Sequence, residues 1–171
     1  MAGDGSVPKL SAGLLVHRVG PDGDRQVLLV HPGGPFWAKK DDGSWSIPKG
    51  EVGPKGEVDP IPDPLDLDPL TQAEREFQEE LGQPPPAGDR VPLGEVVQSG
   101  GKHVVAWAVA GDLDVTTVDS NRFELEWPPR SGRVQSFPEV DRAGWFGVAD
   151  ARRKLLAAQV DLVDRLLALL P

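Results

Sequence analysis

A proline-rich, acidic stretch between Gly50 and Asp68 sets the strongest limit on how this chain can fold. Proline has no backbone N–H to donate, so neither a regular helix nor a central strand can run through the stretch. We therefore expect a long loop over residues 51–68, and loops of this length inside a compact domain often carry a function. Its prolines and aspartates are Pro54, Pro60, Pro62, Pro64, Asp59, Asp63, Asp66 and Asp68.

A helix is predicted directly after this loop. Asp68 is a good N-cap and Pro69 suits the first helical position, while Thr71–Glu74 offers an alternative capping box. Gly82 fits the left-handed position after the last helical residue, and the prolines at 84–86 prevent continuation. The sequence therefore predicts a helix of about three turns that ends at Gly82.

The predicted helix has an acidic side and an apolar side. Glu76, Glu79 and Glu80 lie three and four residues apart and share one face, where Arg75 could brace Glu79. Mg²⁺ or Mn²⁺ would remove their mutual repulsion, because both ions prefer carboxylate oxygens. A solvated acidic face is the alternative, but the apolar stripe opposite indicates a packed helix. That stripe consists of Leu70, Ala73, Phe77 and Leu81.

Strands are expected before, between and after two helical regions, which predicts an α+β fold with a mixed sheet. The expected strands are 11–18 and 26–31, paired as a hairpin, then 45–48, 91–98, 102–110 and 143–146. The expected C-terminal helices are 148–155 and 157–170. A length of 171 residues suits one domain, so we treat 1–171 as a single unit.

Composition and charge exclude several classes of protein. The chain has no cysteine, which rules out disulfides, thiolate zinc sites and cysteine nucleophiles. No secretory signal or membrane-length apolar run is present, so we expect a cytoplasmic protein with no membrane partner. The net charge of −9 argues against a duplex nucleic-acid partner. An acidic protein that acts on phosphates needs metal cations or a few well-placed basic residues.

The helix and the segment before the loop resemble the box of the Nudix hydrolase family, G-x5-E-x7-R-E-U-x-E-E-x-G-U, where U is a bulky apolar residue. The entry through residues 45–50 looks like the diadenosine-polyphosphate hydrolase branch of that family. The resemblance covers about residues 45–83, with weaker support near 139–146. The matching residues are Gly50, Arg75, Glu76, Phe77, Glu79, Glu80 and Gly82.

The resemblance is interrupted in the middle of the box. Six residues separate Gly50 from Glu57 where the pattern has five, and seventeen separate Glu57 from Arg75 where it has seven. Gln83 replaces the final apolar residue. An insertion of about ten residues in the proline-rich loop accounts for both spacings. Glu57 would then keep the family's role of supporting the loop and the helix.

The resemblance implies a fold, a reaction and a metal site. The fold would be an α/β/α sandwich around a mixed sheet, and the reaction a metal-dependent cleavage of a diphosphate. The backbone carbonyl of Lys49 and the carboxylates of Glu76, Glu79 and Glu80 would hold one to three Mg²⁺ or Mn²⁺ ions. Glu139, which precedes Trp145 by six residues as in the family, would join them. Glu79 or Glu139 would take the proton from the attacking water.

Substrate contacts are expected from basic and aromatic residues outside the helix. Basic residues near the predicted site are candidates for binding the phosphates. For each of them, a solvated surface charge is the more usual interpretation. They are Lys39, Lys40, Lys49, Arg130 and Arg133. Trp37 could stack on a nucleobase. The sequence leaves open whether the protein is a monomer or a homodimer.

Three functions remain for the chain at this stage, beside a structural domain whose acidic, proline-rich loop would bind a basic partner. The first is hydrolysis of a nucleoside di- or polyphosphate derivative, with a dinucleoside polyphosphate or a nucleoside triphosphate as first guess. The second is hydrolysis of a non-nucleotide polyphosphate such as a diphosphoinositol phosphate, which the net charge of −9 disfavours. The third is a non-catalytic module that senses a nucleotide. Such members of the family often lose box glutamates, whereas this chain keeps all three on the helix.

Overall fold

The structure is a computed structural model and describes residues 9–53 and 68–171. Glu57 and the core of the predicted loop lie outside the described residues. The strands are β1 (Leu10–Val19), β2 (Arg25–Pro32), β3 (Lys49–Glu51), β4 (Val91–Val97), β5 (His103–Ala110), β6 (Arg122–Glu126), β7 (Val134–Pro138) and β8 (Val140–Gly147). The helices are α1 (Pro69–Leu81), α2 (Val148–Lys154) and α3 (Val160–Leu169), and short 3₁₀ turns occupy η2 (Val115–Thr117) and η3 (Ala157–Gln159).

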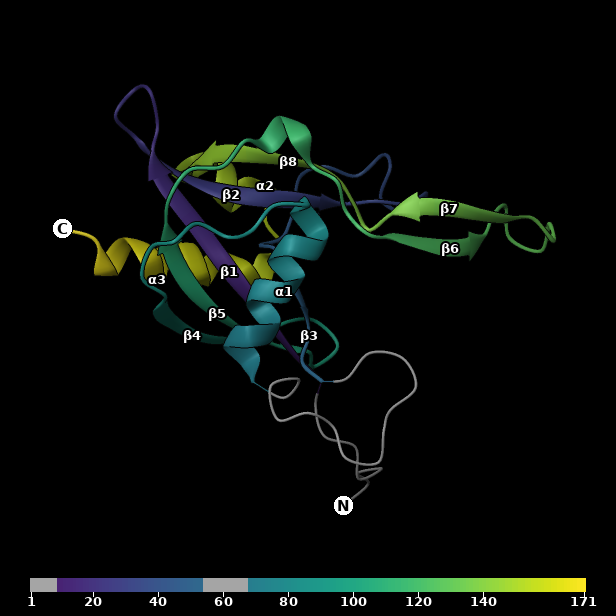
Figure 1. Cartoon of the computed structure of the whole chain (residues 1–171), viewed down its shortest axis with the longest axis horizontal. Helices are drawn as coiled ribbons and strands as arrows, with labels where there is room; N and C mark the ends of the chain where they lie inside the picture. The colour runs from purple at the N-terminus through teal and green to yellow at the C-terminus, as the bar shows by residue number, and fades with distance from the viewer. Residues whose placement is uncertain (1–8, 54–67) are drawn as a thin grey trace, which may run out of the picture.

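A mixed sheet forms the middle of the molecule (Figure 1). Its strands follow the order β4-β5-β1-β2-β8, and β3 pairs with β1 off this path. β1 and β5 run parallel, with Leu14 opposite Trp107, while the other pairs are antiparallel. β6 and β7 form a separate two-stranded hairpin that projects from the body.

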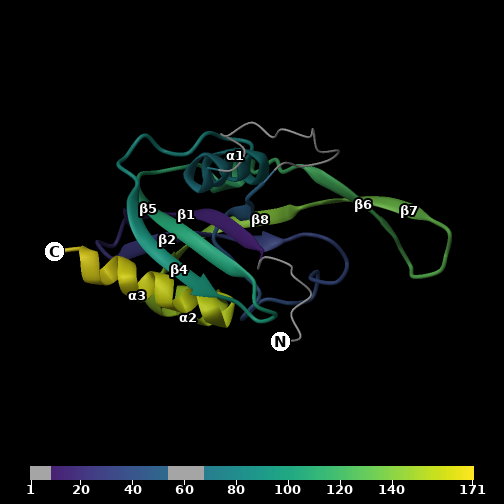
Figure 2. The ribbon, with the colours of Figure 1, turned by 90° about the horizontal axis from the view of Figure 1, so that it is seen from below.

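Helices cover both faces of the sheet, with α1 on one side and α2 and α3 on the other (Figure 2). β1 is buried on both faces, because Leu14 and Val16 pack with Phe77 of α1 while Leu15 packs with Leu162 of α3. This explains why β1 is almost continuously apolar and lacks the alternation of a half-exposed strand. The predicted α+β class and three-layer sandwich are confirmed.

The ends of α1 follow the signals in the sequence. The Asp68 side chain accepts a hydrogen bond from the backbone N–H of Thr71 at 3.0 Å, and Pro69 is the first helical residue. Gly82 has φ +70°, and its N–H donates to the carbonyl of Gln78. A side chain at Gly82 would also come within 2.8 Å of the Asp119 carbonyl oxygen. Glycine is therefore required there for two independent reasons.

Strands β1, β2, β4 and β5 agree with the predicted ranges, but other elements differ. Residues 45–48 form only isolated bridges, Val30 with Ser46 and Trp45 with Leu155, and the paired strand begins at Lys49. β8 is twice as long as the predicted 143–146. The β6–β7 hairpin was not predicted, because its strands flank a Trp-Pro-Pro segment and are mostly exposed. The last helix begins at Val160, after a 3₁₀ turn.

Among residues 9–53 and 68–171, no helix has the length and apolarity needed to cross a lipid bilayer.

Phe77 is the contact through which α1 is held on the sheet, since it is fully buried between Leu14, Leu28 and Val109. We expect Phe77→Ala to lower the free energy of unfolding by about 3–5 kcal/mol, because it leaves a cavity in a packed core. Gln78→Ala, on the exposed side of the same helix, is the matched control and should change it by less than about 0.5 kcal/mol. Urea denaturation measures both, and equal losses would contradict the assignment of the buried face.

Candidate active site

The glutamates of α1 meet the sheet at β3, in the segment that joins β2 to the helix. Glu76 is buried, with 3% of its surface exposed, and lies against Gly50 of β3. A Cβ atom at position 50 would fall 1.9 Å from the Glu76 Cδ atom. No side chain fits there, so residue 50 must be glycine if Glu76 is to keep its place. Two ends of the interrupted motif are thus in direct contact.

The carboxyl group of Glu80 lies deeper in the same region. Its Oε2 atom is buried and has no hydrogen-bond partner among the described residues. Burial raises the pKa of Glu80 well above its ordinary value; nearby Lys49 opposes this shift, and the charges of Glu76 and Glu139 add to it. The backbone N–H of Lys49 also donates to this carboxyl group. A buried carboxylate with an unpaired oxygen is costly, and a cation bound beside it would reduce this cost.

The side chain of Lys49 is half-buried beside these glutamates. Burial lowers the pKa of Lys49, and the positive charge of Lys102 lowers it further. Glu80, Glu51 and Glu76 act in the opposite direction. Lys49 is therefore a basic side chain surrounded by carboxylates, and it could bind a phosphate group of a ligand.

Glu139 reaches this region from a distant part of the chain, at the bend between β7 and β8. Its backbone N–H donates to the Asn121 carbonyl at 2.8 Å, and its carbonyl accepts from Gly33 at 2.9 Å. Asn121 in turn donates its N–H to the carbonyl of Glu79, at 3.0 Å. The end of α1 and the Glu139 bend are therefore fixed to one another through Asn121.

Two adjoining pockets open around these residues. The first, here called the polar pocket, has a volume of about 540 Å³. It is lined by Ser11, Lys49, Gly50, Glu51, Val52, Gly53, Glu76, Glu80, Lys102 and Glu139. The second, the apolar pocket, has a volume of about 570 Å³ and opens between β2, the 44–47 segment and η3. Its lining includes Val30, Trp37, Ser46, Ile47, Gln98, Ser99, Val140, Leu156 and Ala157.

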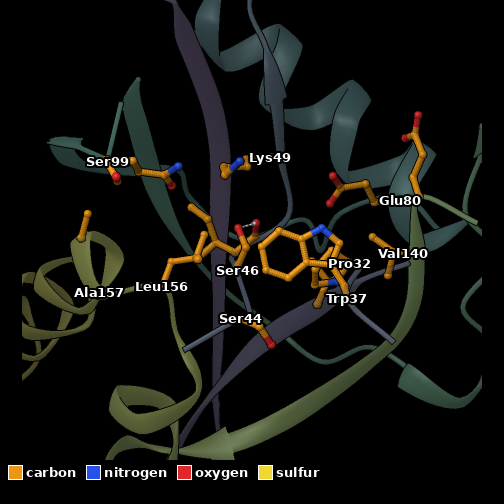
Figure 3. Close-up of a pocket in the computed structure, with 15 residues that line it drawn as sticks. Pro32, Trp37, Ser44, Ser46, Lys49, Glu80, Ser99, Val140, Leu156 and Ala157 are labelled. Atoms are coloured by element: carbon orange, nitrogen blue, oxygen red, sulfur yellow. Dashed lines mark hydrogen bonds between the residues drawn. The ribbon is translucent and has the colours of Figure 1, made fainter. Parts of the chain in front are cut away.

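Lys49, Glu80 and Glu139 line both pockets and so form the wall between them. Figure 3 shows Lys49 and Glu80 facing the apolar pocket together with Trp37. A ligand with a charged part and an apolar or aromatic part could therefore place one part on each side of this wall.

The remaining predicted catalytic residues, Glu79 and Arg75, lie outside both pockets. Glu79 and Arg75 line a separate hollow of about 360 Å³ with Gln78 and Asn121. They belong to the same helix as Glu76 but do not line either of the two larger pockets. Gly82 ends the helix, as the motif requires.

The predicted substrate contacts are distributed unevenly. Trp37 lines the apolar pocket, and the Lys40 ammonium lies 4.9 Å from the centre of its ring, so Lys40 is held at the pocket's edge. Lys39 is exposed in the same loop. Arg130 and Arg133 are exposed at the end of the β6–β7 hairpin and line neither pocket.

The metal prediction can be compared with the donor set. Among the residues the structure describes, no group of three or more Asp, Glu or His side chains is drawn together closely enough to bind a metal as it stands. The chemistry nevertheless fits a divalent cation. Glu76, Glu80 and Glu139 interact electrostatically, and the Glu80 Oε2 atom lacks a donor in the described chain. Mg²⁺ and Mn²⁺ take such oxygens and fill their remaining positions with water or phosphate.

Several pocket residues were not foreseen from the sequence. Gln98, Ser99 and Ser46 line the apolar pocket, and Lys102 lines the polar one. Three of them lie in or beside the β4–β5 turn, which the sequence marks only as a turn. Its position beside the two pockets depends on the parallel pairing of β5 with β1, which no local pattern reveals.

Comparison with known proteins identifies the fold. No protein-family model and no curated protein matches the chain. Solved structures do match. Ap4A hydrolase from C. elegans is 19% identical, with a TM-score of 0.58 over 96% of this chain and 100% of that chain. A Nudix hydrolase from Alicyclobacillus acidocaldarius is 17% identical, with a TM-score of 0.58 over 96% and 93%. The Nudix domain of Shewanella oneidensis NrtR, solved with ADP ribose, is 17% identical, with a TM-score of 0.57 over 95% and 88%. The chain therefore has the Nudix fold, as the resemblance of its motif implied.

The Gly50–Glu76 contact can be tested by a double-mutant cycle. Gly50→Ala should lower the free energy of unfolding by about 1–3 kcal/mol, because the added methyl group displaces Glu76. In a Glu76→Ala background the same substitution should cost much less. Gly147→Ala is the control, since no atom lies within 4 Å of a Cβ there. Equal costs of Gly50→Ala in the two backgrounds, measured by urea denaturation, would rule out the contact.

The buried Glu80 carboxyl predicts a pH-dependent stability. Its pKa is higher in the folded than in the unfolded protein, so stability is lost as the pH rises from the unfolded value through the folded one. Glu80→Gln keeps the shape and removes the charge. We expect it to raise the free energy of unfolding of the metal-free protein at neutral pH, with no gain below about pH 4. Unfolding in EDTA at several pH values measures this.

The control for that experiment is Glu124→Gln, an exposed carboxyl on β6. It should leave the pH dependence of stability unchanged. A Glu80→Gln protein that is less stable than the parent at neutral pH would show that the carboxylate is paired and not strained.

Proposed function

We propose that this chain hydrolyses a pyrophosphate bond in a nucleoside di- or polyphosphate derivative, with Mg²⁺ or Mn²⁺ as cofactor. The observation that carries the proposal is the shared wall of Lys49, Glu80 and Glu139 between a polar and an apolar pocket. A nucleotide has a diphosphate for the first and an aromatic base for the second. The fold shared with an Ap4A hydrolase and with an ADP-ribose-binding domain supports the same class of ligand.

The cation would be held by the carboxylates of Glu76, Glu80 and Glu139 and by the backbone carbonyl of Lys49. The backbone N–H of Lys49 donates a hydrogen bond to the Glu80 carboxyl group. The bound cation supplies neutralisation of the diphosphate charge and a more acidic water. Lys49 and Lys102 bind the non-bridging phosphate oxygens in the polar pocket. Gly50 has no side chain, and the space this leaves in the pocket wall is filled by the Glu76 carboxyl group.

The hydrolytic step requires one proton acceptor. A water oxygen forms a bond to one phosphorus, the bridging P–O bond breaks, and the proton of the water passes to a carboxylate. Glu139 is the better placed of the two candidates, since it lines both pockets, whereas Glu79 lies in the hollow beside Arg75. Glu79 remains the alternative base, and Arg75 orients it.

A specific charge count disfavours the main alternative substrate. The residues that line the two pockets include two lysines, Lys49 and Lys102, and four glutamates, Glu51, Glu76, Glu80 and Glu139. A diphosphoinositol phosphate carries many phosphates on one ring and needs a largely basic pocket. A nucleotide needs positive charge at one end only.

The function is tested by incubating the protein with nucleoside triphosphates, dinucleoside polyphosphates, ADP-ribose and a diphosphoinositol phosphate, with Mg²⁺, Mn²⁺ or EDTA. We expect metal-dependent release of phosphate or a nucleoside monophosphate from a nucleotide. Glu80→Gln and Glu79→Gln should each lower kcat/KM by about 100-fold or more, because each removes a ligand, a base or its support. Glu124→Gln should stay within about twofold of the parent, as surface changes away from a site usually do.

The outcomes separate the alternatives. Tight nucleotide binding without turnover in any metal would identify a sensing module. Turnover of the diphosphoinositol phosphate alone would identify the second substrate class. If Glu139 is the base, Glu139→Gln should abolish the acidic limb of the pH–rate profile while Glu79→Gln keeps it, and the reverse result would assign the base to Glu79.

A further inference from the structure

A buried glutamine connects three segments behind the apolar pocket. Gln159, the last residue of η3, is fully buried. Its Oε1 atom accepts a hydrogen bond from the backbone N–H of Ile47 at 2.9 Å. A backbone N–H can only donate, so the atom that faces it must be the amide oxygen. The Ile47 contact therefore fixes which way round the Gln159 amide lies.

The orientation of the Gln159 amide in turn fixes the orientation of the Gln98 amide. The Gln159 Nε2 atom donates to the Ser46 hydroxyl at 3.0 Å and to the Gln98 Oε1 atom at 2.7 Å. Ser46 can accept because its own proton is donated to the Ile47 carbonyl, at 2.7 Å. Gln98 must present its oxygen to Gln159, so its NH₂ group is turned away. Within residues 9–53 and 68–171 that NH₂ group has no acceptor.

Gln98 is half-buried and lines the apolar pocket. Two serines of the same pocket already donate their hydroxyl protons, Ser44 to the Asp41 carbonyl and Ser46 to the Ile47 carbonyl. Ser99 has a hydroxyl that can either donate or accept, so it does not discriminate between ligands. Lys49, Glu80, Glu139 and the Trp37 indole also line this pocket with donors or acceptors of fixed sense. Among the amide and hydroxyl groups of the lining, Gln98 offers a donor of fixed sense.

We infer that Gln98, held by Gln159, makes the apolar pocket selective for a planar ring whose edge bears an oxo group. The ring would lie near Trp37, whose indole lines the same pocket (Figure 3). An oxo group accepts the fixed N–H, whereas an amino group at the same position would set donor against donor. The inference rests on the proposed function and specifies its substrate: nucleotides with a 6-oxopurine or 4-oxopyrimidine base.

The size of the preference follows from the cost of leaving the amide unpaired. A missing hydrogen bond in a partly buried pocket corresponds to about a tenfold or larger change in affinity. Gln159 is a positioning residue here, since it reaches the ligand only through Gln98. Its removal should erase the preference without reversing it.

The experiment compares inosine with adenosine triphosphate and uridine with cytidine triphosphate. In each pair one base has an oxo group where the other has an amino group. Turnover (kcat/KM) is measured with Mg²⁺, and equilibrium binding of the same nucleotides is measured by calorimetry in EDTA. The parent protein should prefer the oxo member of at least one pair by about tenfold or more.

Gln98→Glu presents oxygen atoms to both Gln159 and the pocket, so the preference should reverse in favour of the amino member. Ser99→Ala, in the same turn and the same pocket, is the control and should leave the ratio within about twofold. Gln159→Leu should bring the ratio close to one, and its melting temperature must be followed because Ile47 loses a buried partner.

The results distinguish the two proposals. Turnover of both members of each pair at the same rate in the parent protein, or a ratio that Gln98→Glu leaves unchanged, would overturn the Gln98 assignment while the hydrolase assignment stands. Absence of turnover would overturn the hydrolase assignment. The ratio of the affinities for the oxo and amino nucleotides, measured in EDTA, would still test the role of Gln98. Equal affinities for the two members of each pair, in both the parent and the Gln98→Glu protein, would overturn that role.

Discussion

The contact between Glu76 and Gly50 is the constraint on which the site depends. It places the acidic face of α1 directly on β3, with no side chain between helix and strand. Acidic faces normally turn to water, because a buried carboxylate loses its solvation. Here the opposite side of the helix overcomes that preference, since Phe77 and Leu81 are fully buried against the sheet. Hydrophobic packing of the opposite face thus keeps the glutamates against the sheet, although solvation of their carboxylates favours exposure to water.

The sequence predicts this helix well because each of its signals is local. A cap, a first-turn proline, a final glycine and a three-to-four spacing all lie within fifteen consecutive residues, and the structure has each of them. The apolar strands β1, β2 and β5 are predictable for the same reason. The β6–β7 hairpin is not predictable in this way, because its strands are mostly exposed and bury few side chains. Only the pairing of the two strands in the folded structure reveals it. Residues 45–48 look like a strand but use their backbone groups in bridges to two different segments.

The residues of the site also differ in whether local sequence signals predict them. The glutamates of α1 follow from spacing, but their meeting with Lys49 and Glu139 follows only from the resemblance to a family. Glu139 is 59 residues or more from every glutamate of the helix, and it is fixed there through Asn121. The Gln159 contacts join residues 61 and 112 positions away. A chain of amides across such distances leaves no periodic trace in the sequence, so only the folded arrangement reveals it.

The two pockets also differ in their effect on the stability of the protein. The apolar pocket is supported by satisfied groups, since Gln159, Ser44 and Ser46 all have partners, and it can therefore be rigid before a ligand arrives. The polar pocket contains a buried carboxyl oxygen with no partner in the described chain, on a glutamate whose pKa is raised. Such a group destabilises the protein, and binding of the proposed cation would relieve this cost. In the proposed function, recognition of the base would thus use a preformed surface, while the reacting end would be complete only with metal and diphosphate both bound.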